Sequence, residues 1–231
     1  MRRLLSQLAR GENAGTDGDW ATAQLERRGI ADPDVLAAMR AVPRERFVLP
    51  EMVGSAYEDG ALPIGYGQTI SQPYVVASMT QALALPAWSA GHGGEAPKVL
   101  DVGTGSGYQA AVLAEMGAQV VSIEREAKLA ERARAVLDDL GYDVTTIVGD
   151  GSAGAPEHAP YAAIVVGAAA PGVPVPLVEQ LLPDGRLVLP LGTRSEQVIT
   201  LVQRTDDGFT REPIEPAVFV PLLGEHGFGS P

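Results

Sequence analysis

The sequence predicts an α/β fold, a doubly wound and mostly parallel sheet with an N-terminal helical extension. From residue 98 onward, short apolar segments alternate with helical patterns, as expected for parallel strands buried on both faces. A glycine-rich run follows the first of these segments, where parallel α/β sheets bind ligands. The first 90 residues instead read as short helices and turns.

In the N-terminal part we expect helices at residues 20–28, 33–42 and from 73 to about 85, and turns or short strands at 61–73. Asp19 and Asp32 are suitable N-caps for the first two helices, and Pro73 suits the first turn of the third. Residues 86–97 read as a mobile linker because of their prolines and glycines, with His92 a solvated loop residue.

The second part supplies the sheet. We expect strands at residues 98–102, 119–123, 144–148, 162–166 and 186–191, and helices at 108–116, 126–140 and 175–182. Two further strands, 197–203 and 217–222, have no helix between them, so one of them should be antiparallel. We therefore describe the chain as an extension, 1–90, and a core, 91–231, that form one compact unit.

Composition excludes several classes of protein. The chain has 231 residues with a formal net charge of −12, which disfavours a nucleic-acid partner because such surfaces need a basic footprint. It has no cysteine, so disulfides, thiolate metal sites and cysteine nucleophiles are excluded. His92, His158 and His226 lack metal-ligand spacing, and we expect no metal.

A membrane location is also disfavoured. The longest apolar stretch, 161–170, is about half the length that a spanning helix needs. Residues 1–10 begin with basic residues like a signal peptide, but Gln7 and Arg10 interrupt the short apolar part. We expect a soluble, cytoplasmic protein, and a monomer.

The glycine loop after the first predicted strand points to a nucleoside ligand without phosphate. Its glycines are Gly103, Gly105 and Gly107, whereas a dinucleotide fingerprint needs its third glycine at 108, where the chain has Tyr108. S-adenosylmethionine carries a sulfonium and an ammonium and no phosphate. Asp101, just before the loop, suits those positive groups, and we expect it to bind the methionine portion directly or through water.

Two more acids follow the next strands. Glu124 lies where doubly wound folds place a carboxylate for ribose hydroxyls, and Asp150 lies where it would reach the adenine amine. Each acid has a structural alternative: Asp101 as a strand-end cap, Glu124 as a first-turn acid and Asp150 as a turn residue. Three acids at successive strand ends beside a glycine loop favour the binding interpretation.

Several motifs resemble the protein-L-isoaspartate O-methyltransferase family. The most specific is residues 62–73 (LPIGYGQTISQP); the other matching stretches are 42–48, 56–59, 101–108, 149–151, 166–171, 185–192 and 219–222. The resemblance implies a Rossmann-like class I S-adenosylmethionine-dependent methyltransferase with a seven-stranded sheet. It also implies methyl transfer to the free α-carboxylate of L-isoaspartyl residues in damaged proteins and peptides, which starts repair through a succinimide.

The resemblance also implies site residues. It assigns Ser71 to catalysis, where we expect its hydroxyl to orient the substrate carboxylate; the alternative is that Ser71 caps the helix near Pro73. The resemblance adds Gln68, Thr69 and Ile70 as neighbours of the cofactor and substrate. Together with the glycine loop and the strand-end acids, the expected cofactor-binding residues are Gln68, Thr69, Ile70, Asp101, Gly103, Thr104, Gly105, Ser106, Gly107, Glu124, Arg125, Asp150 and Gly151. No cation for the substrate carboxylate is identified.

The chain departs from the family pattern at three places. Gly172 stands where many members carry a larger residue, Leu223 where relatives often have Thr, and residues 91–94 look locally expanded. These departures concern local contacts rather than the class of enzyme.

Other functions remain as alternatives. A methyltransferase for genuine aspartate in a modified peptide differs only in substrate, and the end of the chain at Pro231 favours repair because such enzymes often carry further C-terminal sequence. An NAD-dependent oxidoreductase is disfavoured by Tyr108, and a non-catalytic cofactor-binding module by Ser71 together with the three acids. A nucleic-acid methyltransferase is disfavoured by charge and by the sequence after Val166.

Overall fold

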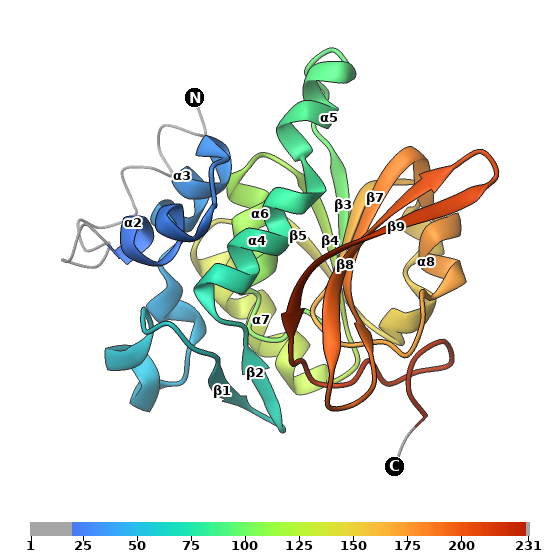
Figure 1. Ribbon diagram of the computed structural model, residues 1–231. Coiled ribbons are helices and arrows are strands. Elements are labelled where there is room, and N and C mark those ends of the chain that lie inside the picture. The colour runs from blue at the N-terminus through green and yellow to red at the C-terminus, as the bar shows by residue number, and fades with distance from the viewer. Residues whose placement is uncertain (1–19, 230–231) are drawn as a thin grey trace.

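The computed structural model describes residues 20–229, and Figure 1 shows a central sheet with helices around it. The strands are β1 (Leu62–Gly65), β2 (Gln68–Ile70), β3 (Lys98–Val102), β4 (Gln119–Glu124), β5 (Val144–Val148), β6 (Tyr161–Val166), β7 (Leu181–Gly192), β8 (Gln197–Thr205) and β9 (Gly208–Ala217). The α-helices are α2 (Trp20–Gln24), α3 (Pro33–Ala41), α4 (Pro73–Leu83), α5 (Leu85–Gly91), α6 (Tyr108–Glu115), α7 (Ala127–Asp139) and α8 (Val175–Glu179). Short 3-10 helices are η1 (Glu26–Arg28), η2 (Arg44–Phe47), η3 (Pro50–Ser55), η4 (Gly151–Ala153) and η5 (Pro156–His158).

The main sheet is the doubly wound sheet that the sequence predicts. Its seven strands lie in the order β5-β4-β3-β6-β7-β8-β9. The pairs from β5 to β7 are parallel, and β8 and β9 are added antiparallel. The chain winds outward from β3 first to β4 and β5, and then returns to β6 on the other side. This switch point creates a crevice at the carboxyl ends of β3 and β6.

The core fills both faces of this sheet. Alternate residues of β3 point to opposite faces, so Val99 joins one hydrophobic cluster and Leu100 the other. The cluster that contains Val99 also includes Leu25, Met39 and Val76 from the N-terminal part. In Figure 1, α2 and α3 accordingly lie on the side of the sheet that α4 and α6 cover; α3 contacts α4 and α6, and α2 contacts α3.

The N-terminal helices largely follow the prediction. Asp32 caps α3, its carboxylate accepting hydrogen bonds from the amides of Asp34 and Val35. The first expected helix is divided into α2 and η1, and the predicted cap Asp19 lies outside the described residues. The signal-like segment 1–10 also lies outside them.

The expected turn region is a two-stranded hairpin that leads into α4. The antiparallel strands β1 and β2 are joined by Tyr66 and Gly67, which both have positive φ (54° and 70°), as a type I′ turn requires. The chain then reaches Ser71 and enters α4, with Pro73 in its first turn. This hairpin places residues 68–71 at the crevice of the main sheet.

The expected linker at 86–97 is wrong in its first half, because α5 occupies Leu85–Gly91. Pro86 lies in the first turn of this helix. Proline is tolerated there because the backbone N–H groups of the first turn have no partner within the helix. His92 is exposed as expected, but its ring stacks on Trp88 at 4.1 Å between centroids.

Two boundaries near the end of the chain are also wrong. Helix α8 ends at Glu179 rather than 182, and β7 begins at Leu181, with an irregularity in its pairing to β6 before Ala163 pairs with Arg186. The expected strand 217–222 is misplaced, because β9 ends at Ala217. β9 is a polar edge strand with two prolines, so its sequence lacks the apolar pattern of a buried strand.

The division at residue 90 falls within α5, and it stays a prediction. Residues 1–19 and 230–231 of the two parts lie outside the described residues. Among residues 20–229, no helix is long and apolar enough to span a membrane, and no cluster of three or more His, Asp or Glu side chains is arranged to hold a metal ion.

Candidate active site

The glycine loop forms the floor of the crevice. It leaves β3 and enters α6 with Gly103, Gly105 and Gly107 at φ values of 90°, 54° and 92°, a region that favours glycine. A Cβ at Gly105 would lie 3.3 Å from Ile64 Cδ1 of the hairpin, and one at Gly107 would lie 3.3 Å from Leu137 Cδ1 of α7. The glycines therefore let the loop turn and pack closely between the hairpin and α7.

Two adjoining cavities lie on this loop. The larger has a volume of about 280 Å³. Besides the expected glycines, it is lined by four other residues that we expected to bind the cofactor, Gln68, Thr69, Glu124 and Arg125. The smaller, of about 50 Å³, lies toward α4 and is lined by Ile70, Ser71, Asp101, Thr104 and Ser106 among others. Thr69, Gly103, Gly105 and Gly167 line both. The structure thus brings together the hairpin, the glycine loop and the acid of β4.

Asp101 is a buried carboxylate, and only one of its two oxygens has a hydrogen-bond partner among residues 20–229. It is 1% exposed, and its Oδ2 accepts a hydrogen bond of 2.7 Å from the Ser122 hydroxyl, which also contacts Thr104 Oγ1 at 2.6 Å. Its Oδ1 is buried without a partner within residues 20–229. Burial raises the pKa of Asp101 to about 7, the Ser122 hydrogen bond opposes this, and the charge of Glu124 adds to it. A cation in the small cavity would satisfy this oxygen.

Glu124 organises the loop from the end of β4. Its Oε2 accepts a 2.9 Å hydrogen bond from the Gly105 amide, and its Oε1 accepts a 3.0 Å bond from the Glu126 amide. The side chain is buried yet lines the larger cavity. Each carboxylate oxygen can accept a second hydrogen bond, so the expected ribose contact is compatible with these bonds and stays a prediction.

The Asp150 carboxylate makes hydrogen bonds within the protein that stabilise the turn after β5 and the C-terminal segment. Its Oδ1 accepts from the amide and hydroxyl of Ser152, and its Oδ2 accepts 2.8 Å from the Glu225 amide near the C-terminal end. Burial raises the pKa of Asp150, but these hydrogen bonds outweigh it and leave the pKa below its ordinary value. Gly151 lines the larger cavity and Asp150 does not. The adenine contact of Asp150 stays a prediction. The alternative role as a turn residue is observed, because Asp150 caps η4.

Ser71 lies between the cofactor-side cavities and a third one. It lines the small cavity and also a cavity of about 200 Å³ bounded by Tyr74 and by the end of β9. The alternative role as a helix cap is wrong, because Gln72 is the N-cap of α4 and no side chain caps it. Ser71 is therefore available to a group lying at the junction of these cavities.

A family comparison decides what kind of site this is. The family model described as protein-L-isoaspartate(D-aspartate) O-methyltransferase matches residues 21–227. The chain belongs to this methyltransferase family. A protein-L-isoaspartate O-methyltransferase of Aeropyrum pernix is 53% identical over 212 residues, covering 89% of this chain and 78% of the relative. One of Methylorubrum extorquens is 52% identical over 209 residues, covering 90% and 88%.

Solved structures of methyltransferases agree with the fold. A protein-L-isoaspartate O-methyltransferase superposes with a TM-score of 0.76 at 27% identity, covering 98% of this chain and 67% of its own. A second, from Plasmodium falciparum, superposes with a TM-score of 0.71 at 25% identity, covering 87% and 95%, and is described in complex with S-adenosyl-L-homocysteine. The class I methyltransferase fold that the sequence predicts is confirmed.

One residue that sequence reasoning missed is Arg44 of η2, which supports the methyltransferase site. It is fully buried, and it donates to the Ala56 carbonyl at 2.7 Å and to the Ser71 carbonyl at 2.8 Å. Its guanidinium lies over the Tyr108 ring, 4.8 Å from the centroid. Burial lowers the pKa of Arg44, which Tyr108 partly opposes. Arg44 thus ties the loop that carries Ser71 to the start of α6; its only signal was the matching stretch 42–48.

Of the three expected departures from the family pattern, only Leu223 lines one of the two cavities on the glycine loop. Gly172 is exposed, and a Cβ there would meet nothing within 4 Å. Leu223 lines the larger cavity with an apolar side chain. Gly91 is the last residue of α5 and Gly93 and Gly94 follow it, and none of the three lines the two cavities on the glycine loop.

Proposed function

We propose that this enzyme transfers the methyl group of S-adenosylmethionine to the free α-carboxylate of L-isoaspartyl residues in damaged proteins and peptides. The family match supports the reaction class. The structural observation that carries the proposal is the buried, half-satisfied Asp101 in a cavity that adjoins Ser71.

The residues present fit the cofactor. When bound, it supplies a methyl group on a positively charged sulfur. Asp101 Oδ1 would hold its ammonium, Glu124 its ribose hydroxyls, and the bare loop from Gly103 to Gly107 would let the backbone approach it. The neighbouring Gln68, Thr69 and Arg125 complete the walls of the larger cavity.

Ser71 orients the acceptor in this proposal. A carboxylic acid with a pKa near ~4 is ionised at neutral pH, so no side chain has to remove a proton before transfer. The Ser71 hydroxyl donates a hydrogen bond to one oxygen of the substrate carboxylate and leaves the other oxygen directed at the methyl group. Catalysis then rests on holding two reactants in line. The nitrogen of the adjacent backbone amide afterwards attacks the ester carbonyl and expels methoxide, which leaves as methanol with the amide proton. Water then opens the resulting succinimide partly to aspartate.

A paired peptide assay tests this function. An isoaspartyl peptide and its aspartyl twin of the same sequence are incubated with labelled S-adenosylmethionine, and methyl ester is quantified on each. We expect label on the isoaspartyl peptide only. Label confined to the aspartyl peptide would replace this function with modification of genuine aspartate, and label on neither would remove it.

We further propose that the enzyme acts as a cytoplasmic monomer, without nucleic-acid or membrane partners. The acidic composition argues against a nucleic-acid partner, and no helix among residues 20–229 is long and apolar enough to span a membrane.

A further inference from the structure

The cavity on the substrate side of Ser71 holds a single cation among the described residues that line it, Arg28 at the end of η1. This cavity of about 200 Å³ shares Thr69, Ser71, Gly167 and Phe219 with the small cavity that contains Asp101. The small cavity itself has no Lys, Arg or His among its described lining residues. A carboxylate that leaves water for this junction needs charged or hydrogen-bonding partners.

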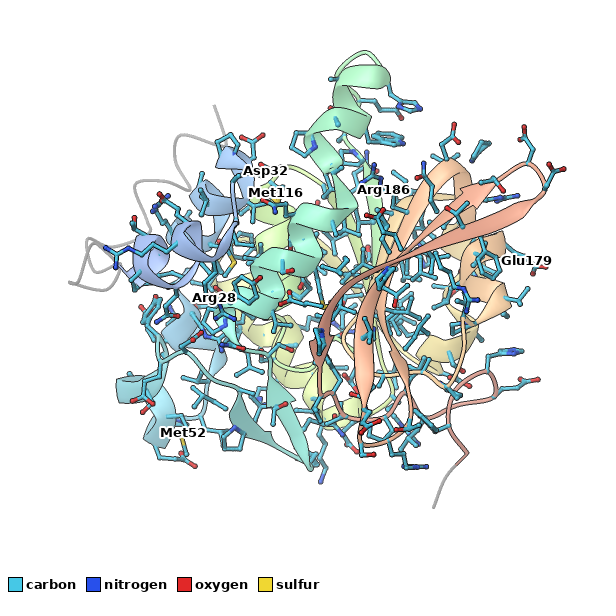
Figure 2. The ribbon with its side chains drawn as sticks, viewed as in Figure 1. Arg28, Asp32, Met52, Met116, Glu179 and Arg186 are labelled. Carbon is cyan, nitrogen blue, oxygen red and sulfur yellow. The ribbon has the colours of Figure 1, made fainter. Side chains whose placement is uncertain are left out.

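Arg28 lies beside α4, stacked on Tyr74 and paired with Asp59. Its guanidinium carbon lies 3.5 Å from the centroid of the Tyr74 ring, and its Nη1 donates to Asp59 Oδ1 and Oδ2 at 3.1 and 3.2 Å. Figure 2 shows Arg28 between the N-terminal helices and α4. Stacking on the ring directs the N–H bonds sideways, in the plane of the guanidinium. Both hydrogen bonds shown for Arg28 within residues 20–229 use Nη1, which leaves Nε and Nη2 to receive an anion.

The two carboxylates near Arg28 already have partners. Asp59 accepts from Arg28 and from the Gln72 amide group, and Glu215 of β9 accepts 2.6 Å from the Ser78 hydroxyl of α4. Arg28 and Asp59 have side chains that are 39% and 47% exposed. An ion pair so close to water is weak, so a substrate carboxylate can compete with Asp59 for the guanidinium.

We propose that Arg28 is the cation that receives the free carboxylate of the isoaspartyl substrate, a specificity residue that acts beside Ser71. This rests on the proposed function. Arg28 would favour the ionised substrate over the neutral methyl ester, because methylation removes the negative charge that the guanidinium attracts. It therefore promotes both binding of the acceptor and release of the product, in a protein whose net charge of −12 would otherwise repel an anionic peptide.

A cycle of two ligands and two proteins tests this inference. Dissociation constants are measured in saturating S-adenosylhomocysteine, so no transfer occurs, for an isoaspartyl peptide and for the same peptide with that α-carboxylate replaced by a carboxamide. In the wild type we expect the carboxylate peptide to bind about 10-fold more tightly than the carboxamide peptide. In Arg28→Gln we expect this preference to fall to about 2-fold or less, with the carboxamide peptide and S-adenosylhomocysteine bound as in the wild type.

Two control variants separate this role from a structural one. Arg27→Gln removes the same charge from the exposed neighbour on η1 and should keep the preference. Asp59→Asn removes the ion pair but leaves Arg28 in place, and should keep or increase the preference. The inference is overturned if Arg28→Gln keeps the full preference for the carboxylate peptide or loses affinity for both peptides equally. It is also overturned if Asp59→Asn lowers the preference as much as Arg28→Gln does. A wild type that binds and methylates no isoaspartyl peptide would instead remove the proposed function.

Discussion

Replacing Asp101 by asparagine is expected to weaken the binding of S-adenosylhomocysteine about 100-fold. Asp101 Oδ1 is buried in the small cavity without a partner, and a ligand ammonium would complete a desolvated charge pair there. Losing one member of such a pair costs roughly 2–5 kcal/mol, of which about 2.7 kcal/mol corresponds to 100-fold. Isothermal titration calorimetry of the wild type and the variant measures the difference.

The same carboxylate makes binding depend on pH. In the ligand-free fold the pKa of Asp101 is raised to about 7, so below that pH the carboxyl is protonated and must lose its proton before it can hold a cation. We therefore expect wild-type affinity to rise about tenfold per pH unit up to about pH 7 and then to level off, with proton release on binding. Asp101→Asn should lack this component, which separates it from titration of the ligand itself. The same pH dependence in both proteins would contradict the assignment.

The raised pKa also has a consequence for stability. The unfolded chain has an ordinary aspartate pKa near ~3.9, so between that pH and about 7 the ligand-free folded state binds the extra proton. The contribution of Asp101 to the free energy of unfolding therefore falls as pH rises through this window. Asp101→Asn stays neutral and is accordingly expected to fold at least as stably as the wild type at pH 8, so a loss of binding there would not reflect unfolding.

Replacing Ser71 by alanine is expected to lower turnover of an isoaspartyl peptide about 10- to 100-fold while S-adenosylhomocysteine affinity changes less than about 2-fold. A hydrogen bond to a charged group contributes roughly 1.5–3 kcal/mol, and here it aligns the acceptor. Ser71 does not cap α4, so its removal leaves the helix start unchanged. Steady-state kinetics beside calorimetry measures both quantities.

Ser71→Thr is the matched control, because it keeps the hydroxyl and should recover part of the lost turnover. Equal turnover in Ser71→Ala and wild type would remove the proposed orienting role. A parallel loss of cofactor affinity would instead place the serine in the cofactor site.

The sequence predicts the glycine loop and its acids because their chemistry is local. Gly103, Gly105 and Gly107 can adopt the positive φ values that a sharp turn after a strand uses, and Asp101 and Glu124 lie at the ends of neighbouring parallel strands, which the sheet brings together. The wall formed by residues 68–71 was expected only from family resemblance. Nothing in the local pattern shows that the β1–β2 hairpin folds back onto the loop.

Other features depend on contacts between distant segments, which a local pattern does not contain. No local pattern marks Arg44 as buried, yet its guanidinium donates to the Ser71 and Ala56 carbonyls and lies over the Tyr108 ring. Asp150 reads as a third ligand for the nucleoside, yet the amide of Glu225, 75 residues later, uses one of its oxygens. The edge strand β9 is formed by pairing with β8 and not by its own apolar pattern.

A crystal structure with S-adenosylhomocysteine and an isoaspartyl peptide would show whether the cofactor ammonium binds Asp101 and the substrate carboxylate binds Ser71. We expect the nucleoside to lie across the ends of β3 and β4, with its ammonium within hydrogen-bond distance of Asp101 Oδ1 and its ribose hydroxyls on Glu124. The peptide carboxylate should lie against the Ser71 hydroxyl, facing the sulfur. A nucleoside bound elsewhere, or one whose ammonium leaves Asp101 Oδ1 without a partner, would contradict this expectation.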